Sequence, residues 1–151
     1  MIVLDHRLLP EEPLPDATLA VMELPLSADQ RTVLRGRRRT ACGREVLLQL
    51  PRERALVPGD RLTNSLRQVP VLVTAAPEEL LRVEAATPLA LLEAAYHLGN
   101  RHVALEVHEH ELLLLDDSVL ASMLKGRGLQ VTRCCRPFRP EGGAYLAHQH
   151  A

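Results

Sequence analysis

The stretch that decides the fold is residues 80–107, which read LLRVEAATPLALLEAAYHLGNRHVALEV. Residues 80–85 are rich in apolar side chains and predict a strand. Thr87-Pro88 then supplies an N-cap and a first-turn proline. The helix is expected to end at Gly99-Asn100, and residues 103–107 predict a second strand. Apolar residues recur between these limits at helical spacing, and we expect them on the inner face: Leu89, Leu92, Ala95 and Tyr96.

The residues that follow continue this alternation of strands and helices. A third strand is predicted at 111–115, after the polar turn 108–110. Asp116-Asp117-Ser118 starts a second helix, and residues 126–128 end it. Residues 129–134 form the last strand. The inner face of the second helix is expected to hold Val119, Leu120, Met123 and Leu124. The resulting order, βαββαβ, is that of the ferredoxin-like arrangement.

The part of the chain before this pattern has a different character. Nine of the eleven prolines lie between Pro10 and Pro88, so long unkinked helices are not expected there. Short strands are predicted at 18–24, 45–50, 61–64 and 69–74. The sequence therefore predicts an α+β protein with three parts: a small, mostly antiparallel β domain at 1–75, a ferredoxin-like domain at 76–145, and a flexible tail at 146–151.

Composition excludes several classes of function. Aromatic residues make up 2% of the 151 residues and the net charge is −1, so neither base stacking nor a phosphate-binding field is available for nucleic acid. No run of 18 apolar residues occurs, which excludes a membrane-spanning helix. Residues 1–7 lack the pattern of a signal peptide, and a cytoplasmic location is expected. The three cysteines are read as reduced thiols.

Histidine is the enriched chemical residue, with six of seven copies in the second part of the chain. The recognised motifs of hydrolases and nucleotide-binding enzymes are absent, which favours a metal-binding module over an enzyme. Each histidine also admits an ordinary role. His97 lies in a last helical turn, where the helix dipole favours an imidazolium. His102 starts a strand, and His108 and His110 flank a solvated turn. The terminal pair, His148 and His150, is free of packing constraints and can reach a metal held elsewhere.

The most specific segment of the chain is Tyr96-His97-Leu98-Gly99-Asn100-Arg101-His102-Val103-Ala104-Leu105. This segment and two others resemble the UreE family of urease accessory proteins, which are nickel metallochaperones. The others are 117–124, similar to the second helix of that family, and 138–145, similar to its closing segment. The resemblance runs in register from Leu80 to Tyr145 and continues more loosely into the first part.

The resemblance implies a nickel site built by symmetry. Family members dimerise through the second domain, and the histidine that matches His102 lies at the two-fold axis, so each subunit gives one imidazole to a shared Ni²⁺. His148 and His150 match the tail histidines that complete the coordination. Some members carry a further histidine pair where this chain has Asp116 and Ser118, so a chaperone of low capacity is expected. Zn²⁺ or Cu²⁺ can compete for such ligands.

The function expected from these observations is delivery of Ni²⁺ to the urease apoprotein by a homodimer, with the GTPase accessory protein UreG as a further partner. The cluster Arg35, Arg37, Arg38 and Arg39 is either a contact for an acidic partner or a solvated loop. Two alternatives stay open on the residues alone. One is an adaptor unrelated to urease, and the other is a small enzyme with His97 or His102 as general base.

Overall fold

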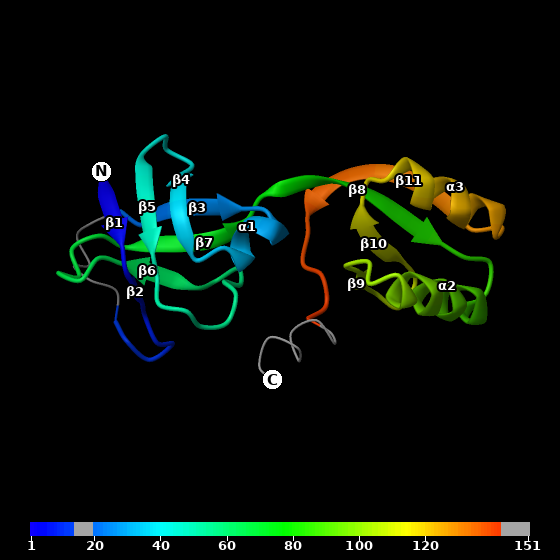
Figure 1. Cartoon of the computed structure of the whole chain (residues 1–151), viewed down its shortest axis with the longest axis horizontal. Coiled ribbons are helices and arrows are strands. Elements are labelled where there is room, and N and C mark those ends of the chain that lie inside the picture. Colours follow the sequence, from blue (N-terminus) through cyan, green and yellow to red (C-terminus); the bar gives the residue numbers. More distant parts are fainter. Residues whose placement is uncertain (14–19, 143–151) are drawn as a thin grey trace. The chain divides into compact units, whose positions relative to one another are not determined.

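The computed structural model describes residues 1–13 and 20–142. The chain divides into two compact units, Met1–Ala76 and Pro77–Ala151, and the second is described through residue 142. Strands and helices occur in both, which makes the protein α+β (Figure 1). Within the described ranges, no helix is long and apolar enough to cross a membrane.

The second unit has the element order β-α-β-β-α-β that the sequence predicted. Its four strands form one antiparallel sheet in the order β11-β8-β10-β9. The predicted strand at 103–107 is shorter in the structure, and the last strand is longer. The elements are β8 (Pro77–Glu84), α2 (Pro88–Asn100), β9 (Glu106–Val107), β10 (Leu112–Leu115), α3 (Ser118–Gly126) and β11 (Gln130–Pro137).

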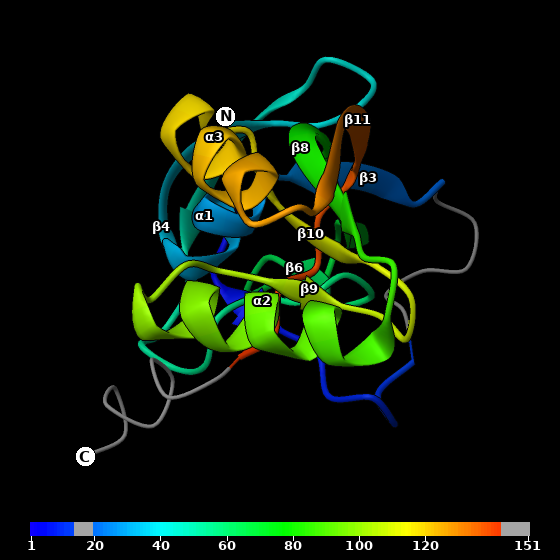
Figure 2. The ribbon, with the colours of Figure 1, turned by 90° about the vertical axis from the view of Figure 1, so that its right-hand side faces the viewer.

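Both helices of this unit pack into one apolar cluster with the sheet (Figure 2). The sheet contributes alternate residues of the two central strands, such as Leu81 and Val83 of β8, as expected for one buried face of a pleated sheet. Each helix is capped by a side chain at its N-terminus. The Thr87 hydroxyl accepts the Ala90 N–H at 3.1 Å, and an Asp117 carboxylate oxygen accepts the Leu120 N–H at 2.9 Å.

The predicted inner faces of both helices need correction. The buried residues of α2 are Leu91, Ala94 and Leu98. The expected core residues Leu89, Leu92 and Tyr96 are instead exposed by 64%, 67% and 66%. At 100° per residue these two sets lie on opposite sides of the helix, so α2 carries two apolar stripes and periodicity could not choose between them. On α3, Val119 is likewise exposed, while Ala121 and Leu124 are buried.

The first unit contains two small sheets. One has the order β1-β5-β4 and the other the order β2-β6-β7-β3. A short helix, α1 (Ala28–Thr32), follows β3 and starts with a capping box between Ser27 and Gln30. The strands are β1 (Ile2–Leu4), β2 (His6–Arg7), β3 (Met22–Leu26), β4 (Arg35–Arg39), β5 (Glu45–Gln49), β6 (Arg61–Thr63) and β7 (Val71–Ala75).

In the described part of the first unit most strand pairings are antiparallel, as the sequence predicted, but two of the five are parallel. β1 pairs with β5 in parallel, and β3 pairs with β7 in parallel. The other three pairings are antiparallel. Alternation of apolar and polar residues identifies a strand but carries no information about the direction of its neighbour. Parallel partners also require long connections, and in both pairs the two strands lie far apart in sequence.

Candidate metal centre

His102 occupies a backbone position that glycine usually takes. It follows the cap residue Arg101 at the end of α2 and has a φ of 57°, in the left-handed region. Its N–H donates to the Gly99 carbonyl at 3.0 Å, and the Val103 N–H donates to the Leu98 carbonyl at 3.1 Å. These two bonds form a Schellman motif, which closes the helix and fixes the His102 backbone. A non-glycine residue in this conformation costs about 1–3 kcal/mol, and such strain clusters at functional sites, which makes His102 a candidate functional residue.

His102 is an exposed residue on this hydrogen-bonded turn. Among the residues of this one chain that the structure describes, no group of three or more histidine, cysteine, aspartate or glutamate side chains could hold a metal ion. A site centred on His102 therefore needs ligands from outside these residues. The expected ligands His148 and His150 lie outside the described residues.

The segment after β11 is held next to the strand that follows His102. Phe138 is fully buried. Arg139 donates its N–H to a Glu106 carboxylate oxygen at 2.6 Å, and Glu141 donates its N–H to the Leu105 carbonyl at 2.6 Å. We call residues 138–141 the strap. It holds Glu141, five positions before the tail, beside Leu105, which is three positions after His102.

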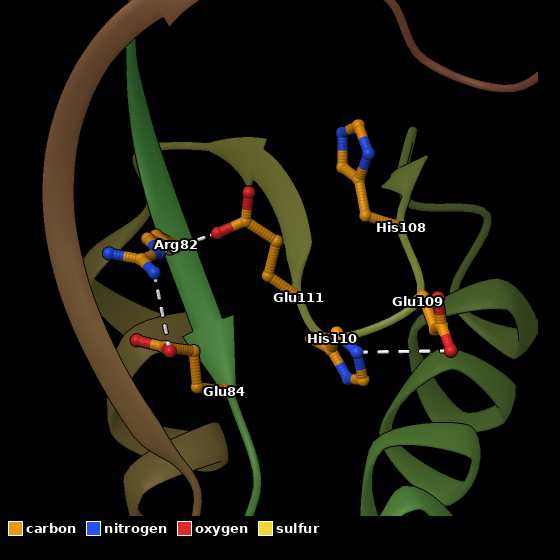
Figure 3. A pocket seen from close by; sticks show the side chains of 6 residues that line it. All are labelled: Arg82, Glu84, His108, Glu109, His110 and Glu111. Carbon is orange, nitrogen blue, oxygen red and sulfur yellow. Dashed lines mark hydrogen bonds and ion pairs between the residues drawn. The ribbon is translucent and has the colours of Figure 1, made fainter.

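His108 and His110 do not form a chelating pair. The His108 Nε2 lies 2.6 Å from a carboxylate oxygen of Glu106, and the His110 Nε2 lies 3.8 Å from a carboxylate oxygen of Glu109. In Figure 3 the two imidazoles lie apart, on the rim of an open pocket of about 330 Å³. His110 is 86% exposed, so its contact with Glu109 constrains it little.

In the pocket of Figure 3, the carboxylate of Glu111 already has two positively charged partners. Arg136 hydrogen-bonds Glu111, with Arg82 on the other carboxylate oxygen, and these partners hold the pKa of Glu111 below its ordinary value. Arg82 also pairs with Glu84. A carboxylate already bonded by two guanidinium groups is a poor cation ligand. The contacts therefore give no support to a metal site at the His108–His110 turn.

The comparisons with known proteins agree along the whole chain. Residues 78–151 match the family model described as UreE urease accessory protein, C-terminal domain. A protein of Synechococcus sp. (strain CC9311) named urease accessory protein UreE is 83% identical over 151 residues, covering 100% of this chain and 97% of its own length. The chain belongs to the UreE family. Another member, from Parasynechococcus marenigrum (strain WH8102), is 63% identical over 99% of this chain and 97% of its own length. A third, from Thermosynechococcus vestitus, is 49% identical over 90% of this chain and 94% of its own length.

These UreE relatives are named accessory proteins rather than enzymes. The chain therefore belongs to a family whose members are named urease accessory proteins, and the expectation that it is not an enzyme agrees with these names. His97, the other residue considered as a general base, is half-buried in the last turn of α2. Its ring packs edge-to-face against Tyr96, with the ring centroids 5.4 Å apart.

Two features of this UreE chain were missed by sequence reasoning. The first is the apolar stripe of α2, which we define as Leu89, Leu92 and Tyr96. It was visible as apolar spacing but was assigned to the core. The second is Glu106, whose carboxylate binds both the strap and His108. Strand alternation does not signal that role, because it depends on a segment 33 residues away.

Proposed function

We propose that this chain is a nickel-binding metallochaperone that delivers Ni²⁺ to the urease apoprotein during assembly of the urease metallocentre. The observation that carries the proposal is His102, an exposed imidazole on a fixed left-handed turn in a member of the UreE family. Imidazole is a good ligand for Ni²⁺, and the same ligands would also accept Zn²⁺ or Cu²⁺. The ion is cargo in this proposal and is passed on.

A homodimer formed through the apolar stripe would supply a second imidazole. Leu89, Leu92 and Tyr96 lie about one helical turn apart, and all three are more than 60% exposed. Exposed apolar patches of this kind mark protein interfaces. The stripe belongs to the helix that ends at His102. In a two-fold dimer each residue near the axis meets its own copy, so one His102 per chain would become two at the shared site.

His148 and His150 would complete the coordination of the shared ion. His148 lies seven positions after Glu141, which corresponds to at most about 25 Å of extended chain. Leu105, where Glu141 is bonded, is three residues from His102, at most about 11 Å. Both tail histidines are thus within reach of His102. Ligands on a free segment can also leave one at a time, which gives the ion a route to a partner protein.

We assign the remaining roles by domain. Residues 76–145 form the ferredoxin-like metal-binding and dimerisation domain, and 146–151 the histidine-containing tail. Residues 1–75 form a β-rich domain that binds a peptide or protein partner. The partners in this proposal are the urease apoprotein complex and the GTPase accessory protein UreG, in the cytoplasm. The strand order β11-β8-β10-β9 and the order of its elements support the ferredoxin-like assignment.

Calorimetric titration of Ni²⁺ tests the proposal. We expect about one tightly bound ion per two chains in the full chain. A version ending at Ala147 should bind more weakly because it lacks both tail histidines. One or more ions per chain, unaffected by truncation, would place the site elsewhere. The absence of tight binding would leave urease accessory function without a nickel-carrying role.

A further inference from the structure

We propose that the outer edge of β4 is a docking edge for an acidic, extended segment of another protein, which pairs with β4 as an added strand. The proposal specifies the partner chemistry of the domain to which a partner-binding role is assigned above. It rests on that role alone and is independent of the nickel site. The edge in question is the side of β4 that faces away from β5.

β4 ends its sheet, in the order β1-β5-β4 (Figure 1). The Leu50 N–H bonds the Leu34 carbonyl, and the Thr40 N–H bonds the Arg44 carbonyl. In an antiparallel pair the bonded positions alternate, so Gly36 and Arg38 direct their backbone groups at β5. Residues 35, 37 and 39 direct theirs outward. Among the described residues, no strand is paired with this edge along 35–39, and the open stretch ends at Ala41, whose N–H donates to the Glu23 carbonyl of β3 at 2.8 Å.

This edge carries an excess of positive charge. Arg35, Arg37 and Arg39 are exposed. Arg39 has an ion-pair partner, Glu45, at 3.3 Å. The side chains of Arg35 and Arg37 form no ion pair with any residue that the structure describes. Like charges along an edge repel a second copy of the same edge, which protects the strand from self-pairing. The same charges attract a strand that carries carboxylates.

The fourth arginine of the cluster brings its guanidinium to the outer edge. Arg38 donates from Nη1 to the outward-facing carbonyl of Arg37 at 2.7 Å. Its Nε is buried and has no hydrogen-bond partner among the described residues. The neighbouring Gly36 has a φ of 138°, and a Cβ there would lie 3.2 Å from the Arg38 Nη1. Glycine at 36 therefore leaves room for this guanidinium. The guanidinium occupies the Arg37 carbonyl, so an added strand has to displace it to pair at that position, which would free its donors for an acidic side chain.

A groove of about 370 Å³ lies beside the arginines of β4. One wall comes from β4 and β5, and the other comes from β3 and α1. The lining residues are Pro25, Gln30, Arg37, Arg38, Arg39 and Glu45. An edge with outward backbone groups, unpaired guanidinium groups and a groove alongside has the elements of strand-addition recognition. Backbone bonds would supply affinity, and the arginines would select acidic side chains.

Fluorescence anisotropy with a labelled peptide tests the proposal. The probe is a peptide of roughly eight alternating Glu and Val residues, close to the length of a natural strand. The full chain is used in buffer with a chelator, so that the nickel site plays no part. A Lys-Val peptide of the same length is the charge control. We expect saturable binding of the Glu-Val peptide and no binding of the Lys-Val peptide.

Two further comparisons locate the binding. The double variant Arg37→Glu with Arg39→Glu should weaken peptide binding by at least about tenfold, because charge-assisted bonds are lost. Arg52→Glu, at an exposed position outside the groove lining, should change it by less than about twofold. Peptides N-methylated at alternate residues separate pairing from simple charge attraction. The peptide methylated at the N–H groups that face β4 should lose binding, and the peptide methylated at the other N–H groups should keep it.

Several results would overturn the proposal. These are equal binding of both N-methylated sets, an equal loss in Arg52→Glu, and no binding of the Glu-Val peptide up to about 1 mM, the limit of weak specific affinity. Competition by an oligouridylate of equal affinity would make the edge a general polyanion site instead. Nickel titration of the same double variant separates the two proposals, because we expect its nickel affinity to be unchanged.

Discussion

Two turns of the second unit present exposed histidines, and they differ in what surrounds the imidazole. His102 follows α2 on a backbone fixed by the Schellman motif, and its ring is exposed. His108 lies in the β9–β10 turn and is already bonded to Glu106, while its neighbour His110 is almost fully exposed. This difference shows that the number of histidines in a turn does not by itself indicate a metal site. A ligand must be held in place and still have its ring nitrogen free.

The largest expected effect comes from replacing His102. His102→Gly should weaken tight Ni²⁺ binding by more than about a hundredfold, since loss of even an outer-shell partner can cost 10–100-fold. Glycine suits the left-handed turn, which removes a strain of about 1–3 kcal/mol, but it also adds freedom to the unfolded chain. The free energy of unfolding should therefore stay unchanged or rise by about 1 kcal/mol. Calorimetry and urea denaturation measure the two quantities.

His102→Ala is the matched control for this variant. It removes the same imidazole but keeps a Cβ in the left-handed conformation, so it should lose nickel binding without any gain in stability. Retention of tight binding in both variants would rule out His102 as a ligand. A large loss of stability in His102→Gly would contradict the strained turn described here.

The next effect tests whether the His102 site is shared between two chains. Leu92→Glu places a charge in the middle of the apolar stripe, at a position that is 67% exposed and outside the core of the unit. We expect the fold to persist, the molar mass in sedimentation equilibrium to halve, and tight nickel binding to fall with it. Gln130→Glu, an equal charge change at an exposed position of β11, is the control. A Leu92→Glu dimer with normal nickel binding would place the interface elsewhere.

How far the sequence predicts this molecule differs between the two units. In the second unit, clear helix caps such as Thr87 and Asp117 and short connections predicted every element in order. In the first unit, β1, β2, β4 and α1 were missed, because they are short and their residues have no distinctive period. The parallel pairing of β3 with β7 depends on contacts between distant segments, which local patterns do not encode.

The candidate site was predictable in part, for a physical reason. The stretch around His102 is recognisable because the end of a helix leaves a local signature of residue types. The sequence could not predict which face of α2 is buried, because Leu91 and Leu92 belong to two apolar stripes on opposite sides of the helix. The strap was invisible for a third reason. The bond from Arg139 to Glu106 joins residues that only the folded sheet brings together.

A smaller effect is expected at the strap. Glu106→Ala removes the carboxylate that accepts the Arg139 N–H and contacts His108. Hydrogen bonds to charged groups contribute about 1.5–3 kcal/mol, and we expect a loss of stability toward the lower end because the segment lies near the surface. Nickel affinity should fall only a few-fold, since loosening the start of a tail changes closure entropy slowly. Urea denaturation and calorimetry measure both. An unchanged free energy of unfolding would show that the strap bond contributes nothing.

The smallest effect is expected from the second turn itself. The double variant His108→Ala with His110→Ala should change tight nickel binding by less than about twofold, because the His108 ring is already bonded to Glu106 and the exposed His110 ring is not held in place. The variant keeps Glu106 and its bond to the strap, so it separates the histidines from the carboxylate beside them. A change as large as that of His102→Ala would reverse the comparison between the two turns. The His108 ring would then have to exchange its Glu106 partner for the metal, and Glu106→Ala would strengthen nickel binding instead of weakening it.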